Sequence, residues 1–189
     1  MLANPLSPSW LAPPADAAAL PAHVWPSSAA RTAEGAITIG GIALPQLAAD
    51  FGTPLFVIDE RDARDRASQT RAAFETAAAA HGTTAVIYYA GKAFLCTEAA
   101  RWMIAEGLNI DVASGGELAV ALAAGVEPAR LGLHGTNKSL SEIDRAVGVG
   151  VGAIVIDSLI EIERVADAAA RHGRVQPVRL RINSGVHAH

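Results

Sequence analysis

Short apolar runs recur along the chain at nearly even intervals. From the middle of the chain onward they begin near Thr84, Leu108, Leu131, Ala153 and Pro177. Their starts are 24, 23, 22 and 24 residues apart. Runs such as Ile154-Val155-Ile156 are apolar throughout, which is typical of parallel strands that are covered on both faces. We therefore predict five evenly spaced strands, preceded by one more strand near Leu55.

Helical segments separate these runs, and glycines end the helices. The glycines are Gly82, Gly107, Gly125, Gly150 and Gly173. Glycine immediately after a helix is the common left-handed cap. Three helices also open with Ser-x-x-Glu, the signature of a capping box, in which the serine and glutamate side chains each accept a backbone N–H. These are Ser114-x-x-Glu117, Ser139-x-x-Glu142 and Ser158-x-x-Glu161.

The alternation of strand and helix predicts an α/β fold. Its even spacing favours part of a (β/α)8 barrel of the TIM type over residues 53–189, with about five of the eight strands. A doubly wound open sheet is the alternative. That fold usually carries a glycine-rich phosphate loop, and no G-x-G-x-x-G follows Leu55–Asp59 or Thr84–Ala90. Because the chain stops at His189, directly after the fifth strand, we expect it to be the front part of a longer protein.

Residues 1–52 differ from the repeat and are predicted to form an N-terminal arm. Proline, alanine and serine dominate residues 1–34, which show no sustained periodicity. A short strand with a following turn is predicted over Ala36–Gly41. A short helix is predicted over Leu44–Phe51, stopped by Gly52.

Composition and charge narrow the classes of function. Of 189 residues, 51% are hydrophobic and 18% are charged, which indicates a globular chain. The net charge is -4 without a basic block, so no nucleic-acid partner is expected. The first cationic side chain is Arg31, and the apolar run 146–156 is too short to cross a bilayer, so we expect neither a secretory signal nor a membrane partner. Cys96 is the single cysteine, which favours the cytoplasm.

Lys92 is the first candidate for chemistry, because it directly follows the apolar run Ala85–Ala90. A lysine at the mouth of a core strand can lose hydration, lower its pKa and form an imine with an aldehyde cofactor. Position alone leaves a solvated lysine at a strand end as an equally good explanation.

Polar side chains follow the other strands, on the rim where a barrel places its active site. Glu117 and Asp111 also have structural explanations, as a helix cap and as a turn residue. Arg181 lies inside an apolar run, so its buried guanidinium would need a partner such as Asp111 or a cofactor. His187 and His189 have no third ligand, so no metal is expected. The rim candidates are Lys92, Asp111, Glu117, His134, Asn137, Lys138 and Arg181.

Several stretches together resemble the bacterial diaminopimelate decarboxylase family over about residues 20–189. These enzymes use pyridoxal phosphate and have a barrel of the alanine racemase type. The sequence departs from the family at Thr136, where asparagine is common, and at Ser184, where proline is usual. The matching stretches are Tyr89–Ala93, Asp111–Leu118, His134–Ser139 and Arg181-Ile182-Asn183-x-Gly185.

The resemblance implies roles for the rim residues. Lys92 matches the lysine that forms the imine with pyridoxal 5'-phosphate, and Asp111, Glu117 and Arg181 match positions around that cofactor. The resemblance places His134, Asn137 and Lys138 in a motif on the same rim without individual roles.

The resemblance also implies an activity, a carboxy-lyase reaction in lysine biosynthesis. The whole enzyme would convert meso-2,6-diaminopimelate to L-lysine and carbon dioxide in the cytoplasm as a homodimer, and its arm over residues 1–52 would join a C-terminal β domain absent from this chain. Alone, the chain is expected to be inactive. The alternatives are a decarboxylase of the same fold acting on ornithine, arginine or carboxynorspermidine, and a non-catalytic pyridoxal-phosphate-binding protein.

Overall fold

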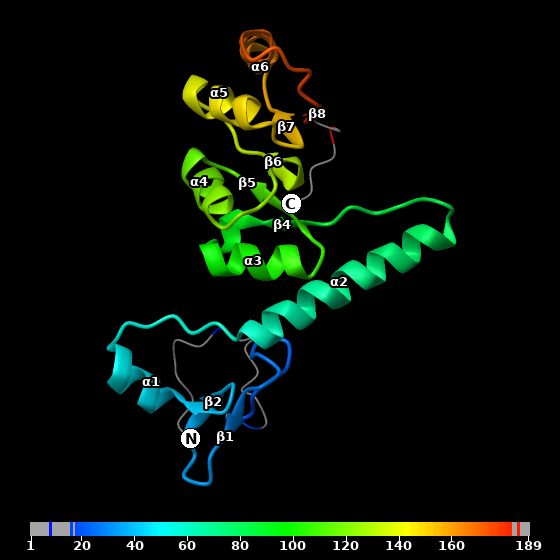
Figure 1. Ribbon diagram of the computed structural model, residues 1–189. Helices are drawn as coiled ribbons and strands as arrows, with labels where there is room; N and C mark the ends of the chain where they lie inside the picture. Colours follow the sequence, from blue (N-terminus) through cyan, green and yellow to red (C-terminus); the bar gives the residue numbers. More distant parts are fainter. Residues whose placement is uncertain (1–7, 9–15, 17, 183–184, 186–189) are drawn as a thin grey trace. The chain divides into compact units, whose positions relative to one another are not determined.

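A computed structural model describes residues 8, 16, 18–182 and 185 of the chain (Figure 1). Asn183, His187 and His189 lie outside the described residues, as does most of the predicted arm before residue 18. The chain divides into two compact units, residues 1–63 and 64–189. The domain boundary predicted at residue 52 stays a prediction.

The first unit contains a small antiparallel sheet followed by a helix. The turn after the predicted strand is formed by Gly40 and Gly41, whose φ angles are 59° and 81°. Positive φ at both central residues gives the primed turn that matches the twist of a two-residue hairpin. The predicted helix is confirmed, with its C-cap at Gly52. The elements are β1 (Ala30–Arg31), β2 (Ile37–Ile39), β3 (Ile42–Ala43) and α1 (Leu44–Phe51).

The strand expected near Leu55 is not formed. Residues 53–59 have no strand conformation, and neither described sheet contains them. An apolar segment becomes a strand only when a neighbouring strand satisfies its backbone, and none pairs with this segment. The chain instead enters helix α2 (Glu60–Ala80), where the Asp59 carboxylate accepts the N–H of Asp62 (3.1 Å).

The second unit contains the five predicted strands as one parallel sheet. The strands are hydrogen-bonded strictly in chain order. Right-handed crossovers between neighbours in that order place every helix on the same face, whereas a doubly wound sheet reverses its order and covers both faces. The sheet is therefore part of a barrel wall, as predicted. Its strands are β4 (Tyr88–Ala90), β5 (Asn109–Val112), β6 (Leu131–Leu133), β7 (Ala153–Ile156) and β8 (Val178–Leu180).

The helices cover the outer face of this sheet (Figure 1). All five glycines predicted to follow helices have positive φ. The three serine caps differ from one another: Ser139 forms a full capping box, Ser114 accepts only the N–H of Glu117, and the Ser158 side chain makes no cap bond. The elements are η1 (Gly91–Ala93), α3 (Thr97–Ala105), α4 (Gly115–Ala123), η2 (Pro128–Arg130), α5 (Leu140–Val149) and α6 (Leu159–Arg171). Cys96 is the N-cap of α3, where its sulfur accepts the N–H of Ala99.

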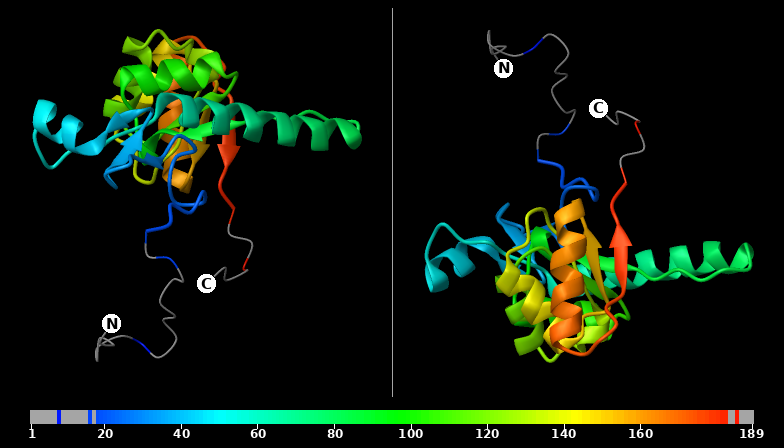
Figure 2. Two further views of the ribbon diagram at one scale, coloured as in Figure 1. Left: turned by 90° about the horizontal axis from the view of Figure 1, so that it is seen from below. Right: turned by 90° about the horizontal axis from the view of Figure 1, so that it is seen from above.

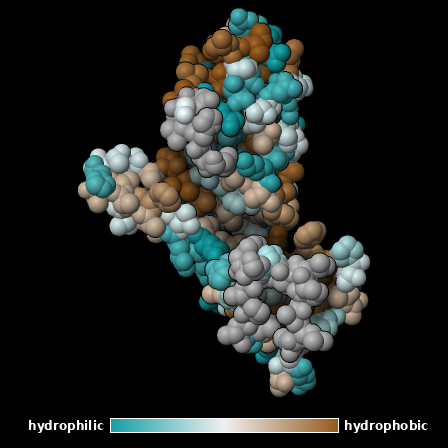
Figure 3. Space-filling view, turned by 180° about the vertical axis from the view of Figure 1, so that it is seen from behind, coloured by the Kyte–Doolittle hydropathy of each residue, from teal (hydrophilic) through white to brown (hydrophobic). Residues whose placement is uncertain are grey.

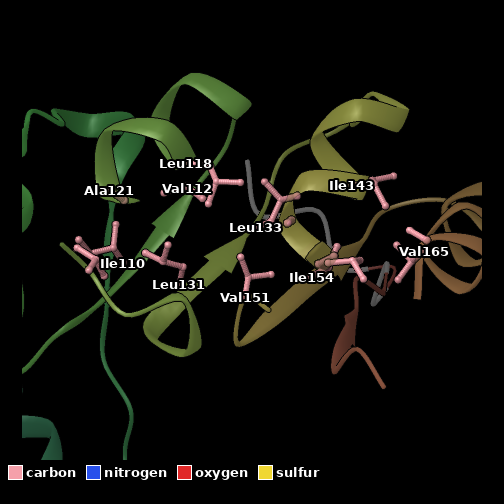
Figure 4. Packing of buried hydrophobic residues seen from close by; sticks show 14 of the residues in the cluster. Ile110, Val112, Leu118, Ala121, Leu131, Leu133, Ile143, Val151, Ile154 and Val165 are labelled. Atoms are coloured by element: carbon pink, nitrogen blue, oxygen red, sulfur yellow. The ribbon is translucent and has the colours of Figure 1, made fainter. Parts of the chain in front are cut away.

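The three inner strands of the sheet and the helices over them form the buried core. Alternate residues of β5 are buried, and all three of β6 are. Leu131 and Leu133 are fully buried, together with Leu118 of α4 and Ile143 of α5. Figure 4 shows these side chains gathered between strands and helices. Since successive strand residues point to opposite faces, the inner face is left to Asn109 and Asp111.

The sheet is strongly curved. In a flat sheet, four strand spacings of about 4.8 Å would separate β4 from β8 by about 19 Å. Instead, side chains from the two end strands contact each other across the inner face. Arg179 Nη2 donates to Tyr88 Oη at 2.9 Å, and the Arg179 guanidinium lies 4.6 Å from the centre of the Tyr88 ring. This contact confirms barrel-like curvature.

Apolar side chains of the end strand β8 reach the surface. Figure 2 shows β8, in red, beside β7 at the edge of the sheet, and all three of its residues are exposed. The prediction of strands covered on both faces is therefore wrong for β8 and also for β4, which has no buried residue; each of these strands has a strand neighbour on only one side among the described residues. Apolar side chains also reach the surface in the upper part of Figure 3, where Figure 1 places α5 and α6. None of the described helices has the length and apolar character needed to span a membrane.

Candidate functional site

A pocket of about 230 Å³ opens at the carboxyl ends of the strands. Four of the predicted site residues line it: Lys92 after β4, Asp111 in β5, His134 after β6 and Arg181 after β8. The parallel sheet brings them together because the carboxyl ends of its strands share one rim. The remaining lining residues are Ala90, Ala113, Gly135 and Thr136.

Lys92 is the lysine that a ligand in this pocket can reach. It lies in the 3-10 turn η1 and is exposed, so the expected loss of hydration is not observed in the described structure. The sequence contains one other lysine, Lys138, whose side chain is only 2% exposed. An aldehyde needs an accessible amine. Lys92 therefore offers an accessible amine on the lining of the pocket.

Asp111 and His134 form a hydrogen-bonded pair across neighbouring strands. Asp111 Oδ2 lies 2.9 Å from His134 Nδ1. Pairing through Nδ1 orients the imidazole and leaves Nε2 as the ring nitrogen available to a ligand. Gly132 provides the space for the carboxylate, because a Cβ at that position would lie 2.9 Å from Asp111 Oδ1.

The prediction for Arg181 is only partly right. Arg181 lines the pocket, but it follows the end of β8, and its side chain is 57% exposed instead of buried. Its NH1 pairs with Asp157 Oδ1 at 3.0 Å, and not with Asp111. The apolar neighbours in sequence had indicated burial, but no sixth strand covers β8 among the described residues.

Glu117 and Asn137 do not line the pocket. Glu117 Oε2 accepts the N–H of Ala113 at 2.8 Å, so the glutamate stabilises the loop that carries the Ala113 wall instead of closing a capping box on Ser114. Asn137 is exposed and has a φ of 53°, a left-handed conformation that asparagine tolerates better than most residues. Within the described parts of the chain, no group of three or more His, Cys, Asp or Glu side chains is placed to hold a metal ion.

Lys138 is buried behind the pocket and pairs with Glu161, which the sequence pattern assigned to a helix cap. Its Nζ lies 2.9 Å from Glu161 Oε2. Asp157 was also missed as a site residue, although it directly follows the apolar run of β7 as Lys92 follows that of β4. Position at a strand end was the signal for Asp157, but no local signal linked Glu161 to a lysine 23 residues earlier.

Glu161 and Glu142 are expected to make the free energy of unfolding depend on pH in the acid range. Burial raises the pKa of Glu161, but hydrogen bonds from Asp157 and Lys138 outweigh it and leave the pKa below its usual value. The N–H groups of Ser139 and Gly115 lower the pKa of Glu142. Because both values are lower in the folded state, this stabilisation is present above about pH 4.5 and is lost as the pH falls through the lowered values.

Urea unfolding between pH 7 and pH 3 measures this effect. The free energy of unfolding is expected to decline below about pH 4.5. A Glu142→Gln/Glu161→Gln variant should show a flatter decline, because glutamine does not titrate. Parallel curves for the two proteins would contradict the assignment.

Comparison with known proteins decides the family. Residues 67–189 match the model of a family described as pyridoxal-dependent decarboxylase, pyridoxal binding domain. The chain belongs to this family. Membership makes the second unit a pyridoxal-binding domain and agrees with the partial barrel seen in the sheet.

Members of the pyridoxal-dependent decarboxylase family with assigned activities resemble the chain along most of its length. The diaminopimelate decarboxylase of Mycobacterium tuberculosis is 53% identical over 167 residues, which cover 88% of this chain and 36% of that protein. The one from Mycobacterium leprae is 49% identical over 183 residues, which cover 97% of this chain and 37% of that protein. The chain therefore spans little more than a third of the length of these relatives.

Solved structures confirm the fold. The diaminopimelate decarboxylase of M. jannaschii in complex with L-lysine has a TM-score of 0.76 and 28% identity, covering 86% of this chain and 37% of that one. A lysine/ornithine decarboxylase of Vibrio vulnificus complexed with cadaverine has a TM-score of 0.60 and 21% identity, covering 74% and 35%. The second likeness concerns the fold alone.

The residues of the pocket fit pyridoxal phosphate chemically. Lys92 offers the amine that an aldehyde carbon requires, and Arg181 offers positive charge for an anionic substituent. Asp111 and His134 offer hydrogen-bonding groups for polar positions of a ring. Gly135 also lines the pocket, and a Cβ at this position would come within 2.7 Å of the Ala113 carbonyl oxygen.

Proposed function

We propose that this chain supplies the cofactor-binding part of a diaminopimelate decarboxylase, which removes one carboxyl group of meso-2,6-diaminopimelate and releases L-lysine and carbon dioxide. One observation carries the proposal: the accessible lysine of the chain stands in a pocket with an Asp–His pair and an arginine. The relatives named diaminopimelate decarboxylase support the choice of substrate.

Each pocket residue has a part in this proposal. Lys92 Nζ would hold pyridoxal phosphate by condensing with its aldehyde carbon, with the carbonyl oxygen leaving as water. When bound, the cofactor supplies an electron sink for the bond that breaks. Asp111 fixes the His134 ring so that Nε2 can hydrogen-bond a ligand or move a proton. Arg181, held by Asp157, attracts an anionic group of a ligand.

Product analysis tests which substrate is decarboxylated. It is carried out on the intact protein, meaning the whole enzyme of which this chain is proposed to be the cofactor-binding part. The protein is supplied with pyridoxal phosphate and, in separate reactions, with meso-diaminopimelate, L-ornithine and L-arginine. We expect L-lysine and carbon dioxide from the first substrate and far slower release of carbon dioxide from the others. Preferential turnover of ornithine or arginine would reject this function in favour of a related decarboxylase.

Asp111→Asn is expected to lower kcat/KM about 100-fold, the lower end of the effect of losing a positioned proton-transfer group. The amide keeps the shape of the carboxylate but removes the charge that favours a proton on His134 Nδ1. Steady-state rates across pH measure the change. Asp144→Asn is the matched control, because Asp144 pairs with Arg171 on the surface. Equal effects of the two variants would contradict the role of Asp111.

The proposal extends to the state of the protein in the cell. We infer a cytoplasmic homodimer; the single cysteine favours the reducing environment of the cytoplasm. Sedimentation of the intact protein is expected to give twice the mass of one chain, and cell fractionation is expected to recover it with the cytosol. A monomer, or recovery with membranes, would contradict this part.

A further inference from the structure

The Lys138–Glu161 pair lies beneath the pocket and is nearly free of solvent. The two side chains are 2% and 1% exposed, and their Nζ and Oε2 atoms are 2.9 Å apart. Burial of two charges costs free energy that their attraction only partly offsets, and apolar residues of similar size are often as stabilising. Stability alone is therefore a weak explanation for this pair.

Glu161 connects the loop after β6, which lines the pocket, to Asp157 after β7, which lies outside the pocket lining but pairs with Arg181. Its Oε2 also accepts the N–H of Asp157 at 2.9 Å, and its Oε1 accepts the N–H of Lys138 at 3.3 Å. Asp157 in turn pairs with Arg181 on the pocket wall. One carboxylate at the start of α6 thus fixes both the loop after β6 and the residue that holds Arg181.

Lys138 continues the connection toward the pocket itself. Its Nζ donates to the carbonyl oxygen of Gly135 at 2.6 Å, and Gly135 lies between His134 and Thr136 on the pocket wall. The ammonium therefore spans the loop from beneath and fixes the backbone that carries the histidine.

A second glutamate makes a similar connection. Glu142, at the start of α5, accepts the N–H of Gly115, the first residue of α4, at 2.7 Å. A glutamate three residues after the N-cap thus bonds to the preceding strand–helix unit at two successive helices.

We propose that Glu161, acting through Lys138 and Asp157, is a positioning residue that sets the distance between the His134 wall and the Arg181 wall of the pocket. The inference rests on the proposed function, because it assigns to this pocket the binding of pyridoxal phosphate at Lys92. Without the pair, the two walls keep their strands but lose their common attachment. Affinity for the cofactor then falls even where the fold stays stable.

The test compares cofactor affinity with stability in the intact protein. The main variant is Lys138→Met/Glu161→Leu, which replaces both charges with apolar groups of similar size. The dissociation constant of pyridoxal phosphate is measured by absorbance titration, and stability is measured by urea unfolding of the cofactor-free protein. Asp144→Asn is the control, since it breaks an exposed α5–α6 ion pair away from the pocket.

We expect the double variant to unfold at a lower urea concentration, because the N–H groups of Lys138 and Asp157 lose their acceptor, and to bind pyridoxal phosphate about tenfold more weakly where it is folded, while Asp144→Asn binds it normally. Wild-type affinity in a folded double variant would overturn the inference. If the double variant does not fold, Glu161→Gln decides: it retains the shape and one acceptor but not the charge. We expect weaker cofactor binding from it as well, and unchanged binding would overturn the inference.

The proposed function can fail separately. If borohydride attaches no cofactor to Lys92 of the wild-type protein, the proposed function fails. If wild-type Lys92 is labelled and the variants bind cofactor equally well, only the positioning role fails.

Discussion

Lys92→Met is expected to lower kcat of the intact protein at least about a thousand-fold, the scale of losing a group that bonds covalently in the reaction. Methionine keeps the length of the side chain but has no amine. Lys138 cannot substitute, because its ammonium is buried and bonded to Glu161 and Gly135. The bound cofactor should also become removable by dialysis, which absorbance spectra measure.

Lys92→Arg is the control for charge. Arginine retains the positive charge, but it stays protonated and does not form an imine under these conditions. We expect it to lose activity as methionine does. Substantial activity in Lys92→Arg would show that Lys92 acts only as a cation, which contradicts covalent attachment.

Leu133→Ala is expected to lower the free energy of unfolding by about 2–5 kcal/mol. Leu133 is fully buried at the centre of the sheet, where few neighbours can move to fill the cavity (Figure 4). A domain of ordinary size is stable by only about 5–15 kcal/mol, so this loss removes a large part of the total. Urea unfolding at pH 7 measures it.

Leu159→Ala is the matched control, because Leu159 is 84% exposed at the first position of α6. We expect a change within about 0.5 kcal/mol. Similar losses in both variants would contradict the placement of the core. Since His134 directly follows Leu133, cofactor affinity should fall with stability in the first variant only.

The local pattern predicted the framework well, for physical reasons. Strand spacing and glycine caps depend on residues close together in sequence, and they identified the five parallel strands and the helix Leu44–Phe51. The same reasoning placed Lys92, Asp111, His134 and Arg181 at one rim, because parallel strands align their carboxyl ends.

Features that depend on distant partners could not be read locally. The run at Leu55 has the composition of a strand, but it has no strand beside it. The motif Ser158-x-x-Glu161 has the composition of a capping box, but a buried lysine 23 residues earlier competes for its carboxylate. Arg181 pairs with Asp157 instead of Asp111, because β7 and not β5 is its neighbour in the sheet.

Covalent trapping of the cofactor shows directly which lysine bonds to it. The intact protein is incubated with pyridoxal phosphate, reduced with borohydride and digested, and the modified peptide is identified by mass spectrometry. We expect a phosphopyridoxyl group on Lys92 and none on Lys138. A modification confined to Lys138, or to any lysine other than Lys92, would contradict covalent attachment at Lys92.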